Sequence, residues 1–401
     1  MMRWLWLLSA VAALPVSAAG WQFSAPLAVT GPARPGVFQH LESAGRRNLA
    51  VGADSVALVW EDNRGGAPQV YVAFKADQAK GFSAPLQVSA GREAYEPAVA
   101  AVADGFVVAW EQDGRVWMRR AAPGRLGPAR QLDSRPSSQA TLAAAADGSR
   151  LYAAWVYRDG RARHVAVSRV RIDGGRLQPA PPRPADARAP HYDQLYPSVA
   201  VSPDSVTVAW EDRREGHTRL YFTYAETGGD FAPLHPLNAL LRPRSRVFGR
   251  GTGVTRVALD ANARGRVAAV WMDKRHFRGG YDVYAAVSDD GGRHFGPNEL
   301  AQDMFGDNNP QWHPAVAVAP SGLVVAAWDD PRDGTPDVWL SWRNAGGWSD
   351  DLAVPGASGP GAQRSPVLAF DPAGRLHIAW VARAGDGGTR IFYSVGHFGG
   401  E

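Results

Sequence analysis

The residues with the clearest chemical potential are carboxylates and a tyrosine in the segments that lead into apolar strands. Glu96, Asp193 and Asp307 carry carboxyl groups, and Tyr196 carries a phenol that could assist one of them. Hydrolysis of a glycosidic bond requires a pair of carboxyl groups, or a tyrosine beside a carboxylate. These four side chains are therefore the catalytic candidates that the sequence offers.

Other kinds of catalytic chemistry find little support. The chain has no cysteine, which excludes thiolate nucleophiles, disulfides and cysteine-based zinc sites. It also has no G-x-S-x-G nucleophile motif, no phosphate loop and no H-E-x-x-H pair. His191, Asp193, Asp307 and His313 have donor atoms that suit a metal, but they share no motif spacing. We therefore expect neither a metal nor another cofactor.

These candidates are embedded in a unit that recurs along the whole chain. In each unit an apolar run ends in tryptophan. The tryptophans are Trp60, Trp110, Trp155, Trp210, Trp271, Trp328 and Trp380. Their spacing of about 50 residues is typical of propellers, solenoids and arrays.

Each unit contains four short apolar or aromatic runs separated by turn residues. In the fourth unit these runs predict strands over residues 198–201, 206–211, 219–224 and 231–234. The first two are apolar at nearly every position, as in a sheet that is covered on both faces. Because helical periodicity is absent after the N-terminal segment, we predict an all-β, seven-bladed β-propeller with four-stranded blades.

The two ends of the chain indicate how the ring closes. The last unit has its third strand at residues 390–394 and no fourth strand, whereas residues 23–27 match the fourth strand of the first unit at residues 82–86. We expect the N-terminal strand to complete the last blade, which would remove two exposed sheet edges. Residues 20–401 then form a single propeller domain.

The first 19 residues have the layout of a secretory signal peptide. Met1-Met2-Arg3 precedes an apolar run over residues 4–14, and small residues follow up to the expected cleavage site after Ala18 or Ala19. No segment is long and apolar enough to span a membrane. We expect an exported protein, located in a bacterial periplasm or outside the cell.

The alignment of the units places a ring of mixed polar residues at the channel mouth. The position four residues before a shared alanine is occupied by Arg46, Glu96, Gln139, Tyr196, Val254, His313 and Ser365. Our candidate ligand-binding residues are Arg46, Arg47, Glu96, Gln139, Tyr196 and His313. Mouth loops on a rigid scaffold often bind ligands; the alternative is that these side chains only face water and vary freely.

The charge pattern bears on the partner. Of the 43 basic residues only Lys75, Lys80 and Lys274 are lysines, and the 39 acidic residues leave a net charge of +4. Acidic and basic residues alternate along the chain rather than forming a basic stripe, so a nucleic acid is not expected. Arginine suits carboxylate and sulfate groups, although this composition places arginine on every loop.

An Asp-x-Arg pattern follows four of the tryptophans. The four copies are Asp62-Asn63-Arg64, Asp212-Arg213-Arg214, Asp273-Lys274-Arg275 and Asp330-Pro331-Arg332. Because the pattern recurs, we interpret it as a structural pairing of carboxylate and guanidinium groups within each turn.

One turn carries a motif that suggests a family. Residues 288–295, Ser-Asp-Asp-Gly-Gly-Arg-His-Phe, match the Asp box S-x-D-x-G-x-x-[FW], and degenerate copies precede Phe82, Phe231 and Trp348. Over the whole mature chain the sequence resembles the sialidase superfamily of Asp-box (BNR-repeat) β-propellers. In that family the box lies away from the active face, so Asp290 is expected to be structural.

The resemblance implies a carbohydrate-related function. Sialidases use an arginine triad, a Tyr-Glu pair and an Asp acid/base, together with an Arg-Ile-Pro segment that this chain lacks; they also have six blades rather than seven. We therefore expect an exported propeller that binds a glycan or another anionic polymer at its mouth. The alternatives are an exo-glycosidase of the sialidase type and an envelope scaffold that binds proteins.

Overall fold

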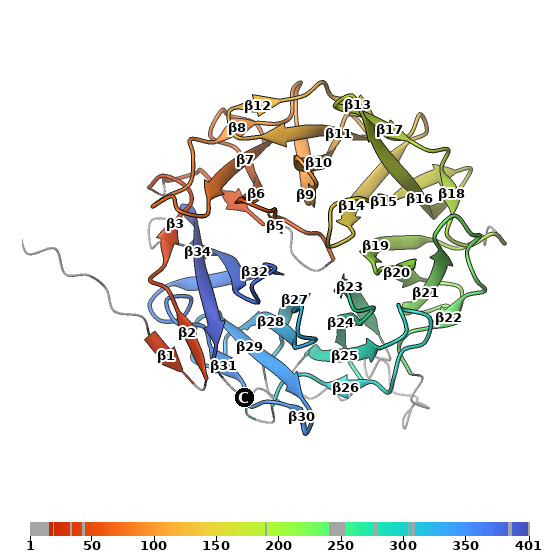
Figure 1. Cartoon of the computed structure of the whole chain (residues 1–401). Helices are drawn as coiled ribbons and strands as arrows, with labels where there is room; N and C mark the ends of the chain where they lie inside the picture. The colour runs from red at the N-terminus through yellow and green to blue at the C-terminus, as the bar shows by residue number, and fades with distance from the viewer. Residues whose placement is uncertain are drawn as a thin grey trace, which may run out of the picture.

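The computed structural model describes residues 16–18, 20–32, 34–41, 45–188, 191–239, 253–275, 280–303, 305, 309–383 and 387–399. No α-helix occurs in these residues. They form seven antiparallel sheets arranged in a ring (Figure 1). The expected all-β, seven-bladed propeller is confirmed.

The blades follow one another in chain order. Blade 1 contains β4 (Gln39–His40), β5 (Leu49–Val51), β6 (Ser55–Asp62), β7 (Gln69–Ala76) and β8 (Leu86–Gln87). Blade 2 contains β9 (Ala94–Val102), β10 (Gly105–Gln112), β11 (Arg115–Ala122), β12 (Arg125–Leu126) and β13 (Arg130–Gln131). Blade 3 contains β14 (Ser137–Ala144), β15 (Leu151–Asp159), β16 (Ala162–Asp173), β17 (Arg176–Pro179) and β18 (Arg183–Pro184). Blade 4 contains β19 (Gln194–Val201), β20 (Ser205–Asp212), β21 (Arg219–Glu226) and β22 (His235–Pro236).

The other three blades have the same order of strands from the axis outward. Blade 5 contains β23 (Val254–Ala261), β24 (Val267–Asp273), β25 (Asp282–Ser288) and β26 (Glu299–Leu300). Blade 6 contains β27 (Trp312–Val318), β28 (Val324–Asp330), β29 (Asp337–Asn344), β30 (Gly347–Trp348) and β31 (Leu352–Ala353). Blade 7 contains β32 (Ala362–Phe370), β33 (Leu376–Arg383) and β34 (Thr389–Phe398), together with β1 (Val16–Ala18), β2 (Trp21–Phe23) and β3 (Leu27–Ala28) from the N-terminal part of the chain.

The outer strand of blade 4 differs from the expectation. The sequence predicted a fourth strand over residues 231–234, but Phe231 makes only an isolated bridge to Ala225 and the paired strand is β22. Pro233 interrupts the expected stretch because proline has no N–H to donate to the ladder. Pairing with β21 resumes only beyond it.

The ring closes as predicted, through N-terminal strands that pair with β34. Both β2 and β3 are antiparallel to β34 (Figure 1). Trp21 is fully buried and contacts the rings of Phe23, Trp342 and Phe398. The outermost strand β1 pairs with β2, and it falls within the predicted signal peptide. In a chain cleaved after Ala18 or Ala19, β2 would be the edge strand of this blade.

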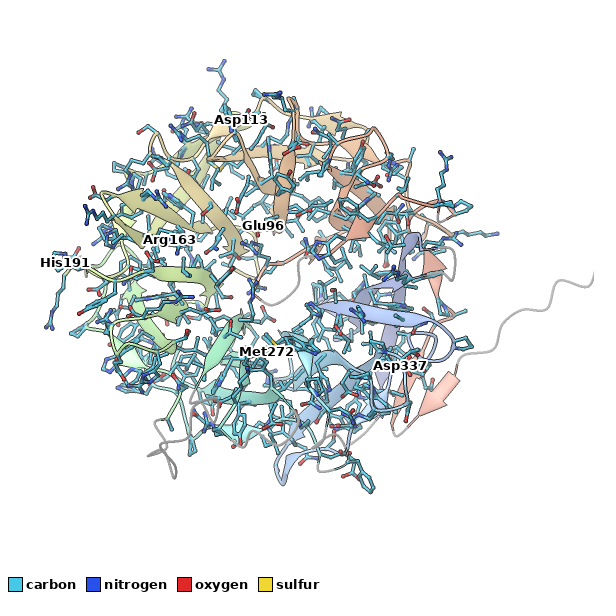
Figure 2. The ribbon with its side chains drawn as sticks, turned by 180° about the vertical axis from the view of Figure 1, so that it is seen from behind. Glu96, Asp113, Arg163, His191, Met272 and Asp337 are labelled. Atoms are coloured by element: carbon cyan, nitrogen blue, oxygen red, sulfur yellow. The ribbon has the colours of Figure 1, made fainter. Side chains whose placement is uncertain are left out.

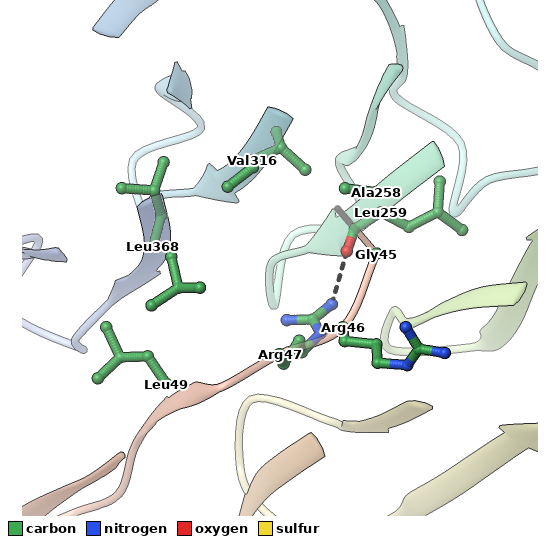
Figure 3. Close-up of a pocket in the computed structure, with 10 residues that line it drawn as sticks. Gly45, Arg46, Arg47, Leu49, Ala258, Leu259, Val316 and Leu368 are labelled. Atoms are coloured by element: carbon green, nitrogen blue, oxygen red, sulfur yellow. Dashed lines mark hydrogen bonds between the residues drawn. The ribbon is translucent and has the colours of Figure 1, made fainter. Parts of the chain in front are cut away.

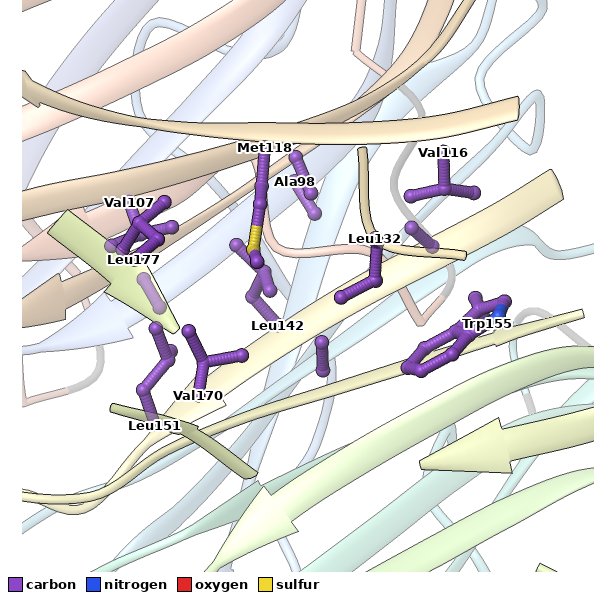
Figure 4. Packing of buried hydrophobic residues seen from close by; sticks show 14 of the residues in the cluster. Ala98, Val107, Val116, Met118, Leu132, Leu142, Leu151, Trp155, Val170 and Leu177 are labelled. Carbon is purple, nitrogen blue, oxygen red and sulfur yellow. The ribbon is translucent and has the colours of Figure 1, made fainter. Parts of the chain in front are cut away.

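The hydrophobic core is divided among the contacts between blades. Each of the seven buried apolar clusters joins two neighbouring blades and contains one of the repeated tryptophans. Figure 4 shows the cluster between blades 2 and 3, which includes Met118, Leu142 and Trp155. These tryptophans are at most 1% exposed. They therefore hold the blades together and leave the polar inner strand ends free to form a site.

Candidate functional site

The innermost strands of six blades share one irregularity near their starts. Each shifts register there, and one residue that is not glycine adopts a positive φ between 49° and 61°. These residues are Glu96, Gln139, Tyr196, Arg256, His313 and Ser365. We call them the bulge residues. Left-handed backbone is uncommon outside glycine and carries strain, so its recurrence shows that the surrounding structure imposes it.

A side chain from the preceding blade stabilises several of these bulges. The bulge leaves a backbone N–H outside the strand ladder, and a buried N–H needs an acceptor. Glu61 accepts the N–H of Glu96 at 2.5 Å, and Asp329 accepts that of Ser365 at 2.8 Å. The carboxylate of Glu111 accepts from Gln139. Inter-blade hydrogen bonds therefore fix the ring of bulge residues.

Blade 4 shows that the acceptor can vary. Val156 occupies the position after Trp155, where an acid stands in the neighbouring blade. The N–H of Tyr196 instead donates to the side-chain oxygen of Gln139 at 2.7 Å. One bulge residue thus supports the next one along the ring.

The predicted ring was wrong in blade 5. The alignment placed Val254 in the ring, but Val254 is buried and pairs with Asp273 at the start of β23. Arg256 is the bulge residue, and its N–H donates to Glu211 at 2.8 Å. The alignment took Ala258 as the shared alanine. Ala258 pairs with Val270, the residue before Trp271, just as Ala98 in blade 2 pairs with the residue before Trp110, so Ala258 is equivalent to Ala98 and not to Ala100. The ring therefore contains an arginine that the sequence analysis missed.

Blade 1 replaces the bulge with a segment that contacts the opposite side of the channel. Between β4 and β5, the carbonyl oxygen of Gly45 accepts hydrogen bonds from Thr141 and Ser198, in blades 3 and 4, at 3.1 and 3.4 Å. Only glycine fits there, because a Cβ at Gly45 would lie 2.4 Å from the Val257 carbonyl oxygen and its φ is +98°. We call residues 45–48 the channel segment.

The channel segment leaves little open space at the centre. Arg47 donates to Asp260 Oδ1 at 2.6 Å. It also donates to the Leu259 carbonyl at 2.9 Å, the contact that is dashed in Figure 3. A cavity beside Arg47 has a volume of about 30 Å³ and is lined partly by Leu49, Val316 and Leu368. This space suits about one water molecule. The described part of the channel segment therefore occupies part of the centre of the ring.

Arg46, Glu96 and Glu111 form a charged cluster beside the channel segment. The Arg46 side chain is 4% exposed and forms an ion pair with Glu96. Burial opposes ionisation of Glu96, but Arg46 and a hydrogen bond from Glu111 hold its pKa below the usual value. Burial and the Glu96 carboxylate raise the pKa of Glu111 to about 9. At neutral pH one carboxyl group is therefore ionised and its partner is protonated.

A second group of side chains joins blades 4 and 5. The Arg256 guanidinium lies over the ring of Tyr196, 3.7 Å from its centre. Arg256 also lies close enough to Glu96 to help lower the pKa of that carboxyl group. Tyr196 and Arg256 are both partly exposed. Figure 2 shows Glu96 on the inner side of the ring, whereas Asp113 and His191 lie at its periphery.

The remaining sequence candidates lie at different distances from this group. Asp193 braces the neighbouring turn through Arg163, with its Oδ2 2.6 Å from Nη2 of the arginine, and these hydrogen bonds lower its pKa. His313 is a bulge residue, and its Nδ1 lies 2.7 Å from Asp329 Oδ1. Asp307 falls outside the described residues. The structure thus brings Arg46, Glu96, Gln139 and Tyr196 together, while Asp193 is hydrogen-bonded to Arg163 and stabilises a turn.

An aromatic surface extends the mouth over blades 5 and 6. Trp312 directly precedes His313, is 39% exposed and meets the Tyr281 ring edge-on at 5.6 Å between centres. Lys274 lies 4.2 Å from the centre of the Tyr281 ring. We call Trp312 and Tyr281 the aromatic shelf. An exposed tryptophan beside cationic groups offers a flat apolar contact for a ligand.

The carboxylates that hold the bulges were not among the candidates from the sequence. A signal was present, because Glu61, Glu111, Glu211 and Asp329 each follow a repeated tryptophan directly. The tryptophan packs between blades, so the next side chain along the strand points the other way. That alternation could have located all four.

The Asp-x-Arg turns are structural, as predicted. In blade 4, Asp212 accepts from the backbone and side chain of Arg214 and from Trp210 Nε1 at 3.1 Å. Arg214 in turn covers the ring of Tyr221. The same arrangement holds the turns at Asp62, Asp273 and Asp330.

The Asp box also acts as a turn. Asp290 accepts hydrogen bonds from the backbone of Arg293 and His294, both at 3.0 Å, and Ser288 donates to it at 2.7 Å. The Gly291 carbonyl accepts from Ser205 in blade 4. The box therefore joins two blades.

Within the described ranges, no group of three or more histidine, aspartate or glutamate side chains is placed to hold a metal ion. No helix in the described part of the chain could cross a membrane.

Comparisons with known proteins show the fold. No family model matches the chain, and no curated protein matches it. Among solved structures, the chain is similar to a polysaccharide lyase of family PL25, an ulvan lyase bound to -[GlcA(1-4)Rha3S]- (TM-score 0.59, 10% identity, 90% of this chain and 94% of that chain).

Two further structures cover nearly all of both chains. One is a protein of unknown function from Dyadobacter fermentans (TM-score 0.55, 12% identity, 95% and 100%). The other is the α-L-arabinanase of Penicillium chrysogenum complexed with arabinobiose (TM-score 0.50, 12% identity, 93% and 98%). At this identity the similarity establishes the propeller architecture alone.

Proposed function

We propose that this protein is an exported propeller that binds an acidic oligosaccharide at its mouth. The observation that carries the proposal is the meeting of Glu96, Tyr196 and Arg256, from three different blades, in partly exposed positions. Such a convergence of polar groups on a rigid scaffold is typical of ligand sites.

The types of side chain favour a sugar with an acidic group. Arg256 presents a guanidinium that can bind a carboxylate or sulfate with two hydrogen bonds. Trp312 and Tyr196 offer apolar ring surface for the C–H face of a sugar. Two of the structures with the same fold were solved with an oligosaccharide bound, which supports glycan as the ligand class.

The internal pairing of Arg46 and Arg47 changes their part in the proposal. Both were candidate ligand-binding residues, but Arg46 pairs with Glu96 and Arg47 pairs with Asp260. We assign an anion contact to Arg256 because its guanidinium lies over the partly exposed Tyr196 ring, while Arg46 holds Glu96 in its ionised form. Gln139 and His313 remain candidate hydrogen-bonding groups at the edge of the same site.

The carboxyl groups favour a binding protein over a glycosidase. A glycosidase needs two carboxyl groups about 5 to 9.5 Å apart across the substrate. Glu96 and Glu111 share a hydrogen bond, so they are closer than that. Asp193 is paired with Arg163, which leaves it poorly placed as an acid or base.

The experiment measures binding of labelled uronic-acid oligosaccharides and of neutral arabino-oligosaccharides by the mature chain. We expect the acidic set to bind, with affinity that falls as salt rises. Arg256→Asn and Trp312→Ala should each weaken binding about tenfold, on the scale of an interface hot spot. Asparagine is used at position 256 because it tolerates a positive φ.

The matched control is Arg169→Asn, at an exposed arginine on β16 away from the mouth. It should bind like the parent protein. Equal affinity for acidic and neutral sugars, or full binding by both mouth variants, would contradict the proposal. Turnover of a fluorogenic glycoside that disappears in Glu96→Gln or Tyr196→Phe would establish the glycosidase alternative, and no sugar binding at all would favour the scaffold.

A further inference from the structure

A second basic surface lies on the face opposite the mouth, between blades 2 and 3. Turns between third and fourth strands occupy this face, and the β11–β12 and β16–β17 turns border two adjoining cavities of about 240 and 160 Å³. In Figure 1, β12, β13 and β17 follow one another along the rim. Arg120 and Gly175 line both cavities, which therefore adjoin as one groove. We call it the rim groove.

Arg120 is held in place where the two cavities meet. Its Nη2 donates to the Asp104 carbonyl at 2.7 Å and lies 2.9 Å from the Asp104 carboxylate. The side chain is only 14% exposed. A Cβ at Gly175 would lie 3.4 Å from Nη1 of Arg120, and Gly175 has a φ of +78°. The glycine turn thus leaves one edge of a fixed guanidinium accessible from the groove.

Three more arginines surround it without internal partners. Arg125 lines the larger cavity, and Arg130 and Arg176 line the smaller one. All three are exposed, and within the described residues their side chains make no hydrogen bond or ion pair. No acidic side chain lines either cavity. In lacking an ion-pair partner among the described residues, the three groove arginines differ from the arginines of the Asp-x-Arg turns, whose charge is balanced by the aspartate of the same turn.

We propose that the rim groove binds a linear polysaccharide that carries sulfate or carboxylate groups. Arginines in both halves of the groove match anions that repeat along a chain rather than one small anion, and each guanidinium can bind such a group with two hydrogen bonds. Pro128, Ala129 and Leu177 supply apolar surface between the charges. This site is separate from the mouth, so the inference does not depend on the proposed function.

The test measures binding of a fluorescent heparin oligosaccharide to the mature chain at several salt concentrations. The groove variant carries Arg125→Gln, Arg130→Gln and Arg176→Gln. A matched control carries Arg34→Gln, Arg169→Gln and Arg171→Gln, which removes the same charge from exposed arginines outside the groove. We expect the groove variant to bind about tenfold more weakly and with a smaller salt dependence, from the loss of three exposed charge contacts.

Two results with the variants would overturn the inference. One is heparin binding by the groove variant that equals that of the parent protein. The other is an equal loss in the matched control, which would show that only net charge matters. Preferential binding to vesicles that contain phosphatidylglycerol, with no binding to heparin, would assign the groove to a lipid headgroup and also contradict the proposal.

The mouth variant Arg256→Asn separates the two proposals. It should retain the binding of heparin at the groove while it loses the short uronic-acid oligosaccharide. The groove variant should retain the binding of the short uronic-acid oligosaccharide at the mouth while its binding of heparin is weakened. Failure of either site is therefore visible without reference to the other.

Discussion

Arg47 in blade 1 pairs with Asp260 in blade 5, with Nη1 2.6 Å from Oδ1, across the centre of the ring. The second oxygen of Asp260 accepts the N–H of Val318 in blade 6 at 2.7 Å. One carboxylate therefore joins blade 1 to blades 5 and 6, which lie far from it in the chain. The channel segment is held in the ring by this contact and does not simply fill the space.

Loss of the Arg47 to Asp260 pair should destabilise the whole propeller. Arg47→Met keeps most of the side-chain volume but leaves the partly buried Asp260 without its cation. We expect a loss of about 2 kcal/mol in the free energy of unfolding, less than for a fully buried pair because Arg47 is 29% exposed. Urea denaturation of both single variants and of Arg47→Met/Asp260→Asn measures the coupling. Additive effects would show that the pair contributes nothing beyond its separate members.

The repeated tryptophan should be among the most sensitive positions in the core. Trp210 is 0% exposed and belongs to the cluster between blades 3 and 4. Trp210→Ala should lower the free energy of unfolding by about 3 to 5 kcal/mol, because it leaves a cavity. The comparison is Trp312→Ala, at a partly exposed tryptophan, which should cost much less. A loss below about 1 kcal/mol at Trp210 would place it outside the core.

Closure of the ring should depend on the N-terminal strands. Deletion of residues 21–29 removes β2 and β3 and leaves the edge of β34 unpaired. We expect the shortened protein to aggregate, because an exposed sheet edge is a template for pairing between molecules. Size-exclusion chromatography and thermal melting report the result. A truncated chain that stays monomeric and melts like the mature protein would rule out this role.

Glu111 should make stability depend on pH. Burial and Glu96 raise its pKa to about 9 in the folded protein, from 4.5 for an unperturbed glutamate side chain. Between these values the folded state holds a proton that the unfolded state has released, so its contribution to stability is complete below about pH 4.5 and is lost as pH rises towards 9.

The variant Glu111→Gln isolates this contribution. The amide can keep the hydrogen bonds to Gln139 and Glu96 without titrating. From pH 5 to pH 9 the stability of the parent protein should fall relative to the variant, by at most about 1.4 kcal/mol per pH unit. The control is Asp54→Asn, which removes an exposed carboxyl group in the β5–β6 turn. Parallel pH profiles for Glu111→Gln and the parent would contradict the raised pKa.

The architecture was predictable from the sequence because it depends on local and repeated patterns. Apolar runs that end in tryptophan, turn residues between them and the match between residues 23–27 and 82–86 all act over short stretches, and their repetition adds to the signal. The Asp-x-Arg turns were predictable for the same reason, since Asp212 and Arg214 are only two residues apart.

The site was only partly predictable because it is made by contacts between blades. The sequence placed Glu96, Gln139, Tyr196 and His313 at equivalent positions, which the backbone of the bulges bears out. It missed Arg256, because the alignment matched Ala258 to Ala100 of blade 2. Ala258 is in fact equivalent to Ala98, and this error moves the predicted ring position by two residues.

The sequence by itself determined the number of blades, the tryptophan contacts and the closing strand, since each follows from a repeated local pattern. Only the tertiary structure decided that Arg46 and Arg47 are paired with Glu96 and Asp260, which lie 50 and 213 residues away in the chain. The charge of an arginine is visible in a sequence. Whether that charge remains available to a ligand depends on which carboxylate the folded chain brings next to it.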